Sequence, residues 1–287
     1  MKYQQLQHLS LPDFKRYTGL SKQTFDLMIT SWNQYYFSAS DAGRPSKLSP
    51  QDQILLALQY WREYRTYFHL SQDWGLSEST VCRIVHKVET VLLDSGQFRL
   101  PGKKSLLQDE SRPNKVTTDV TETPIERPSK NQKQYYSGKK KQHTLKCQIT
   151  IDKETLEIIC LFVGQGVNHD FYIFKASKVK FHPQTKSYQD SGYQGIQKYH
   201  HNAVTPHKKR KNQELTVEQK KYNQALSKER ITIEHVNRNL KTFQILRGRY
   251  RNRTKGYQRR CNLIAAIYNH ELKLSQNLNR TIDAQYI

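Results

Sequence analysis

Apolar residues in the first 98 positions recur at steps of three and four, the spacing that places them on one face of an α-helix. The spacing is clearest over residues 11–32. Ser49 followed by Pro50 is typical of a helix start, because serine caps free backbone amides and proline fits the first helical position. Two further helices are predicted on either side of Gly75. The segment 1–98 is therefore predicted to be an all-helical domain.

The pattern changes after a stretch, 99–115, that is rich in proline, glycine and charge and is predicted to be a linker. Short β-branched and apolar stretches follow, as expected for strands. Strands are predicted at 116–121, 145–151 and 156–163 and before Asp190, and helices from near Asp170 and over 217–246 and 258–274. The order predicts an α/β domain over 116–274, followed by a tail at 275–287 that is expected to fray.

The composition indicates a chain that folds and binds a polyanion. Lysine and arginine number 47 against 25 aspartates and glutamates, which gives a formal net charge of +22. Hydrophobic residues make up 36% of the chain and include 18 tyrosines and 10 phenylalanines, enough for a core. A strongly basic protein of this kind is expected to meet nucleic acid.

Membrane and secretory classes are not favoured. The longest purely apolar run, 158–163, is far shorter than the roughly 20 residues that span a bilayer. The N-terminal segment MKYQQLQHLSLPDFKRY contains no apolar region of a secretory signal. The four cysteines show no paired spacing, which fits a reducing compartment without structural zinc. We therefore expect a cytoplasmic protein.

The segment 66–88 has the layout of a helix-turn-helix, within a domain at about 48–92. Gly75 permits the left-handed backbone that ends the first helix, Leu76 can fill the angle, and Ser77 can cap the second helix. The outward residues expected to read bases in the major groove are Ser79, Arg83 and Lys87. An ordinary pair of packed helices uses the same joint, but the basic charge and the turn length favour DNA reading.

Acidic residues are scarce in the second domain, and most of them lie where hairpins, helix caps or polar surface explain them. Three are harder to explain in this way. Asp119 lies inside a predicted strand, Asp190 ends another strand before a glycine turn, and Glu234 lies on a helix. Brought together, they would make an oxygen-rich site suited to Mg²⁺ or Mn²⁺.

The helix around Glu234 presents two cations beside that carboxylate. At 100° per residue, Arg230 and Lys241 fall within about 40° of Glu234, next to a separate apolar stripe. A surface salt-bridge ladder would give the same spacing. On this helix alone, a ladder and a functional face are equally well supported.

Two stretches are basic and contain no acid. Residues 127–151 hold seven lysines and arginines, and residues 235–270 hold nine. Aromatic residues are interleaved with them, so a track for the DNA backbone is favoured over ordinary solvated charge. The candidate phosphate contacts, besides Arg230 and Lys241, are Lys139, Lys140, Lys141, Arg247, Arg249 and Arg251.

Four motifs in this order resemble those of bacterial insertion-sequence transposases of the DDE type. The motifs are Asp119-Val120-Thr121 with the residues up to Pro128, the basic stretch from Tyr135 to Thr144, the stretch Asp190-Ser191-Gly192-Tyr193-Gln194-Gly195, and the Arg230, Glu234, Lys241 spacing. Many members carry a tyrosine three positions before that arginine, where this chain has Ser227. The resemblance covers nearly the whole chain.

The resemblance implies a ribonuclease-H-like mixed sheet flanked by helices, preceded by the helical helix-turn-helix domain. It implies that Asp119, Asp190 and Glu234 hold two divalent ions, Mg²⁺ or Mn²⁺, with Asp119 between them. Its partners would be double-stranded DNA, as the terminal inverted repeats of an element and a target, bound by a homodimer or higher oligomer at the nucleoid. The activity implied is cleavage of the element's ends followed by strand transfer. A catalytically inactive or domesticated DNA-binding protein is the alternative, and a site-specific nuclease without strand transfer is a third possibility.

Overall fold

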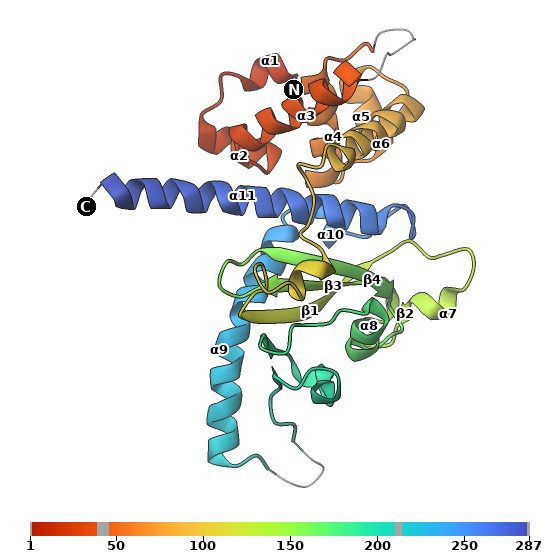
Figure 1. Ribbon diagram of the computed structural model, residues 1–287. Coiled ribbons are helices and arrows are strands. Elements are labelled where there is room, and N and C mark those ends of the chain that lie inside the picture. Colours follow the sequence, from red (N-terminus) through yellow and green to blue (C-terminus); the bar gives the residue numbers. More distant parts are fainter. Residues whose placement is uncertain (1, 39–45, 210–213, 286–287) are drawn as a thin grey trace. The chain divides into compact units, whose positions relative to one another are not determined.

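The computed structural model describes residues 2–38, 46–209 and 214–285, and the chain divides into two compact units (Figure 1). The helical unit comprises 1–99, 240–248 and 262–287. The sheet unit comprises 100–239 and 249–261. The expected limits were 1–98 and 116–274. The main difference is that the C-terminal helix groups with the N-terminal helices.

The helical unit consists of helices whose starts follow the local sequence. They are α1 (Tyr3–Leu6), α2 (Leu11–Thr18), α3 (Lys22–Ser38), α4 (Pro50–Arg62), α5 (Tyr67–Trp74), α6 (Glu78–Asp94), α10 (Gln244–Arg247) and most of α11 (Tyr257–Gln285). The Ser49 hydroxyl accepts a hydrogen bond from the Asp52 amide at 3.1 Å, as expected for the cap of α4. Within the core of this unit, the Trp61 indole donates to Glu89 at 3.2 Å.

The Glu271 carboxylate of helix α11 binds residues of α2, of α3 and of the segment between them. Glu271 accepts hydrogen bonds from the Ser21 amide at 2.8 Å and the Ser21 hydroxyl at 2.6 Å, and it also accepts from Thr24. The Lys15 ammonium lies 2.9 Å from the same carboxylate. The segment expected to be a frayed tail, 275–287, is helical as far as Gln285, and residues 286 and 287 lie outside the described residues.

The sheet unit contains a mixed sheet with helices on both faces, which confirms the predicted α/β class. Its strands are β1 (Lys115–Pro124), β2 (Tyr136–Ser137), β3 (Gln142–Asp152), β4 (Ile158–Gln165), β5 (Lys186–Tyr188) and β6 (Ala203–Val204). The strand order is β2-β3-β1-β5-β6, with β4 also paired to β3. β3 is antiparallel to β1 and to β4, whereas β5 is parallel to β1.

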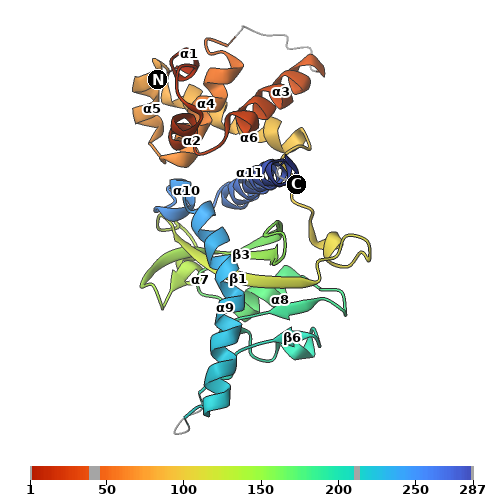
Figure 2. The same cartoon turned by 90° about the vertical axis from the view of Figure 1, so that its left-hand side faces the viewer.

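Short helical segments connect these strands, and a long helix follows them. They are η1 (Lys103–Leu106), α7 (Gln132–Tyr135), α8 (Asp170–Ser177), η2 (Ser191–Tyr193), η3 (Ile196–Lys198) and α9 (Val217–Leu240). Alternate residues of β1 serve opposite faces. Val116 and Val120 pack in a cluster with Phe174 of α8, whereas Asp119 is hydrogen-bonded to Asn237 of α9. Figure 2 shows α9 passing in front of β1.

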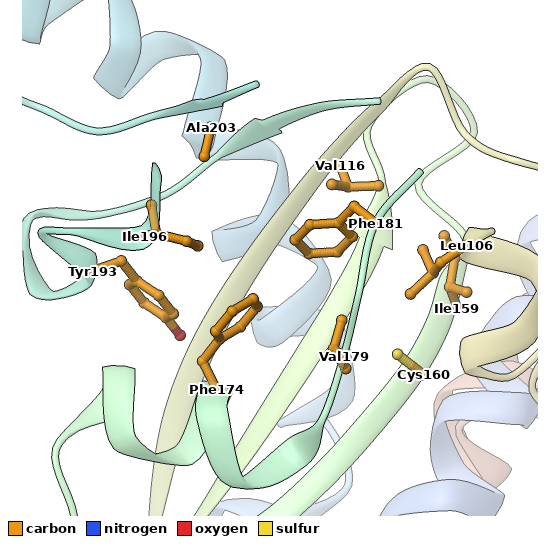
Figure 3. Packing of buried hydrophobic residues seen from close by; sticks show 10 residues of the cluster. All are labelled: Leu106, Val116, Ile159, Cys160, Phe174, Val179, Phe181, Tyr193, Ile196 and Ala203. Atoms are coloured by element: carbon orange, nitrogen blue, oxygen red, sulfur yellow. The ribbon is translucent and has the colours of Figure 1, made fainter. Parts of the chain in front are cut away.

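One apolar cluster joins η1, the sheet, α8 and the segments after β5 (Figure 3). Its buried members are Leu106, Val116, Ile159, Cys160, Phe174, Val179, Phe181, Tyr193, Ile196 and Ala203. Leu106 belongs to the stretch that was expected to be a linker, 99–115, and it is fully buried. Most of that stretch is thus part of the sheet unit, because a buried leucine fixes it to the core.

Within the described ranges, no helix combines the length and hydrophobicity needed to cross a bilayer.

Candidate active site

Asp119 and Asp190 lie at equivalent places on two neighbouring parallel strands. β1 and β5 are paired from Lys115 with Lys186 up to Thr117 with Tyr188. Each aspartate follows two residues after this last pair, so the common register carries both to the same end of the sheet. The strand pairing therefore brings together two of the three carboxylates that the sequence singled out.

A tight turn directly after β5 orients Asp190. The Asp190 carboxylate accepts a hydrogen bond from the Gly192 amide at 2.7 Å and caps η2. A Cβ atom at position 192 would lie only 2.9 Å from Oδ1 of Asp190. A side chain at position 192 would therefore displace the Asp190 carboxylate from this position.

Asp119 is held in a half-buried environment of mixed charge. Its Oδ2 atom accepts a hydrogen bond from the Asn237 amide at 2.8 Å. Burial raises the pKa of the Asp119 carboxyl, and the negative charges of Asp190 and Asp170 raise it further, while the Val120 backbone amide and the Arg230 charge oppose the shift. Burial is thus the main reason why the ionised form of Asp119 is disfavoured, and the two nearby aspartates add to it.

Helix α9 presents its polar face to Asp119 and buries its apolar stripe. Ile233, Val236 and Leu240 of the predicted stripe are buried on α9, whereas Phe243, also buried, lies beyond the helix, which ends at Leu240 and not at the predicted residue 246. On a helical wheel, Glu234 falls within about 60° of Asn237 and lies between Asn237 and Arg230 along the axis. Asn237 and Arg230 act on Asp119, whereas Glu234 is exposed between them on α9 and its place beside the two aspartates stays a prediction.

Arg230 is half-buried and belongs to the sheet unit with Asp119. Lys241 is half-buried as well, but it follows the end of α9 and belongs to the helical unit. The helix therefore presents Arg230, Glu234 and Asn237 together in one unit. The expected role of Lys241 stays a prediction.

No group of three or more histidine, cysteine, aspartate or glutamate side chains among the described residues is arranged to hold a metal ion. Three buried polar atoms nevertheless lack a hydrogen-bond partner around Asp119: Oη of Tyr193, Nε of Arg230 and Oδ1 of Asn237. Buried polar atoms are normally paired, so these three need an explanation, and a bound ligand would supply one. The carboxylate oxygens nearby suit Mg²⁺ or Mn²⁺, so the residues present fit a divalent ion.

A buried lysine ties a further acid to this end of the sheet. Lys146 of β3 is 8% exposed, and its ammonium lies 2.9 Å from Asp170 and 3.4 Å from Glu122. It also donates to the Asn168 carbonyl at 2.7 Å. A helix was predicted to begin near Asp170, and α8 begins at Asp170 itself, without a side-chain cap.

Sequence reasoning did not assign roles to Tyr193, Asn237 or Lys146. Tyr193 lies three residues after Asp190, and Asn237 lies one helical turn after Glu234, so their spacing was a usable signal. Lys146 stands among buried residues of β3, where a charge is rarely found without a partner.

The helix-turn-helix is formed as predicted. Gly75 adopts a left-handed conformation with φ of 63°, and the Ser77 hydroxyl accepts from the Thr80 amide at 3.3 Å. Ser79 and Arg83 are exposed on α6. Lys87 is placed differently from the expectation, because its ammonium lies over the rings of two aromatic residues, 5.3 Å from that of Trp32 and 4.2 Å from that of Tyr36.

The candidate phosphate contacts are on the surface of both units. Exposed Lys139, Lys140 and Lys141 form the turn between β2 and β3. Arg249 is exposed and Arg251 half-buried in the sheet unit, and Arg247 is exposed in the helical unit. Their accessibility allows contact with DNA, and their roles stay predictions.

The helix-turn-helix and the ribonuclease-H-like sheet, with paired aspartates at one end, define a DNA-processing protein of the transposase class. Residues 118–269 match the family described as DDE superfamily endonuclease, and residues 46–98 match the helix-turn-helix of DDE superfamily endonuclease. The chain belongs to this family of insertion-sequence transposases.

Two relatives bear this out. The chain is 51% identical over 274 residues to a protein of Microchaete diplosiphon described as "probable transposase for insertion sequence element IS702", covering 96% of this chain and 99% of that one. It is 27% identical over 236 residues to a protein of Streptomyces albus G with a description of the same kind, for insertion sequence element IS112, covering 80% and 84% of the two chains. No solved structure matches the chain at a significant level.

Proposed function

We propose that this protein cleaves the ends of its insertion sequence and transfers the freed 3′-OH ends to target DNA by metal-dependent phosphoryl transfer. The observation that carries the proposal is the shared register of Asp119 and Asp190, together with the α9 residues Asn237 and Arg230, which act on Asp119. No observation favours the alternative of an inactive DNA-binding protein.

In this proposal Asp119, Asp190 and Glu234 would hold two divalent ions. When bound, such ions activate the attacking oxygen and stabilise the charge of the leaving oxygen. Mg²⁺ and Mn²⁺ both suit an all-carboxylate ligand set. The pKa of Asp119 is raised mainly by burial, and a bound cation would offset this cost of its ionised form.

The other residues of the site orient the carboxylates and neutralise phosphate charge. The amide of Asn237 fixes the Oδ2 atom of Asp119 and so orients its carboxylate. Arg230 carries a permanent positive charge beside Asp119 and can bind a phosphate oxygen next to the reacting bond. Lys241 would extend this contact along the DNA backbone.

DNA recognition is divided between the two units. Ser79 and Arg83 would read bases of the terminal inverted repeats through α6. The basic contacts would bind phosphates of the repeats and of the target: Lys139, Lys140, Lys141, Arg247, Arg249 and Arg251. Because two ends must be cut and joined together, we propose a homodimer or higher oligomer on DNA, acting at the nucleoid in the cytoplasm.

The test is cleavage of a labelled duplex that carries the element's terminal repeat, with Mg²⁺ or Mn²⁺ present. Asp119→Asn should bind the duplex normally but release no 3′-OH end and join none to a target plasmid. Asp152→Asn is a matched control, because Asp152 lies at the far end of β3 and its carboxylate only accepts from the Glu154 amide in a turn. Metal-dependent cleavage by Asp119→Asn would refute the proposed site.

A further inference from the structure

Tyr193 is a fully buried tyrosine directly beside the candidate active site. It ends η2, three residues after Asp190, and its exposed fraction is 0%. Its ring centroid lies 6.2 Å from that of Phe171 and 5.9 Å from that of Phe174, in the first turns of α8. Tyr193 thus packs the turn that carries Asp190 against the helix that begins with Asp170.

The hydroxyl of Tyr193 has no hydrogen-bond partner among the described residues. Figure 3 shows the ring beside Ile196 and Phe174, with the oxygen at the end of the ring nearest Phe174. A phenylalanine would fill the same space without burying an unpaired polar group. Packing therefore explains the ring but gives no reason for the hydroxyl.

The charges around this hydroxyl are those of the candidate site. Burial raises the pKa of Tyr193 well above its ordinary value, and the negative charges of Asp119, Asp170 and Asp190 add to the shift against the positive charge of Arg230. A phenol hydroxyl is a hydrogen-bond donor, and each of these three carboxylates is an acceptor.

We propose that Tyr193 is a positioning residue whose hydroxyl donates a hydrogen bond to Asp119 when a divalent cation draws the carboxylates together. Asn237 already binds Oδ2 of Asp119, so a donor on the other side would fix the carboxylate plane between two partners. Outer partners of this kind hold metal-binding carboxylates in the bound geometry. The inference rests on the proposed metal-dependent function.

The first experiment measures Mn²⁺ binding to the full-length protein without DNA, from the electron paramagnetic resonance signal of free Mn²⁺. Tyr193→Phe should weaken binding about tenfold or more, the usual effect of losing an outer partner. Its melting temperature without metal should be unchanged or higher, because the variant removes an unpaired buried hydroxyl. Tyr257→Phe is the matched control, since that buried hydroxyl donates to Thr123 at 2.7 Å. It should lose stability and keep Mn²⁺ affinity.

Asp119→Asn separates the two proposals. If that variant loses Mn²⁺ binding while Tyr193→Phe binds as tightly as the wild type, the inference on Tyr193 is overturned and the proposed metal site stands. If Asp119→Asn binds Mn²⁺ as the wild type does, the proposed site and the inference both fail.

A second measurement leaves the ring and its hydroxyl in place. With 3-fluorotyrosine incorporated at position 193, the ¹⁹F resonance should shift when Mg²⁺ is added, because the phenol gains a hydrogen-bond acceptor. The same label at position 257 should not shift. Equal responses at the two positions would overturn the inference even if Tyr193→Phe failed to fold.

Discussion

Replacing the buried Lys146 tests how the acids at this end of the sheet are held. Its ammonium faces Asp170 at 2.9 Å and Glu122 at 3.4 Å, and the side chains of Lys146 and Glu122 are only 10% and 11% exposed. Lys146→Met keeps most of the side-chain volume but removes the cation. Two carboxylates would then remain close together without a counter-charge.

The expected loss follows from that burial. Removing one partner of a buried ion pair costs about 3–5 kcal/mol, because the other charge stays buried and unpaired. The Asp170 side chain is 35% exposed, so water can screen part of its charge. We therefore expect the lower end of the range, about 3 kcal/mol, in the free energy of unfolding of the sheet unit.

Hydrogen exchange in β1 and β3 is the suitable assay. Tryptophan fluorescence would report on the wrong part of the chain, because Trp32, Trp61 and Trp74 all lie in the helical unit. At about 1.4 kcal/mol per factor of ten, the protected amides of these strands should exchange about a hundredfold faster in Lys146→Met.

The matched control is Lys115→Met on the neighbouring strand. The Lys115 ammonium lies 3.6 Å from Glu154, and the two side chains are 47% and 49% exposed. Such an exposed pair contributes under about 1 kcal/mol. If Lys146→Met accelerates exchange no more than this control does, the ion pair does not anchor Asp170 and the reasoning from burial is wrong.

Three further predictions use other parts of the chain. Asp119→Asn should raise the melting temperature at pH 7, because burial raises the pKa of Asp119 and the ionised carboxylate therefore lowers the stability of the wild type. The gain should vanish below pH 3.8, the ordinary pKa of an aspartate, where the carboxyl is protonated in both the folded and the unfolded state. No gain at pH 7 would contradict the burial argument. Glu271→Gln should speed hydrogen exchange over residues 262–278. Burial raises the pKa of Glu271, but the hydrogen bonds that its carboxylate accepts lower the pKa below 4.5. The wild type should therefore lose its protection from exchange only as the pH falls below 4.5. Unchanged exchange in Glu271→Gln would show that the carboxylate does not hold α11 in place. Arg83→Ala should weaken binding to the terminal repeat by about 1–3 kcal/mol and leave binding to random DNA unchanged. Arg249→Ala should weaken binding to both duplexes and lower the slope of log affinity against log salt concentration by about one. Equal losses of affinity on both duplexes for Arg83→Ala would exclude base reading by Arg83.

Local sequence was sufficient for the features that depend on neighbouring residues. The left-handed Gly75 and the capping Ser77 define the helix-turn-helix within a few positions, and the structure has both. The buried stripe of α9 follows from helical spacing in the same way. Asp119 within a strand and Asp190 after one were also predicted correctly, because β-branched stretches and glycine turns are local signals.

Only the tertiary structure decided which distant residues meet. The register of β1 with β5 joins residues 71 positions apart, and no local pattern encodes that pairing. The expected tail is helical because hydrogen bonds to Ser21 and Thr24 fasten Glu271, some 250 residues away in sequence. Tyr193 and Lys146 likewise look like an ordinary aromatic and an ordinary basic residue in sequence. Burial beside carboxylates from other elements gives them their significance, because the energies of a hydroxyl and an ammonium depend on what surrounds them in the fold.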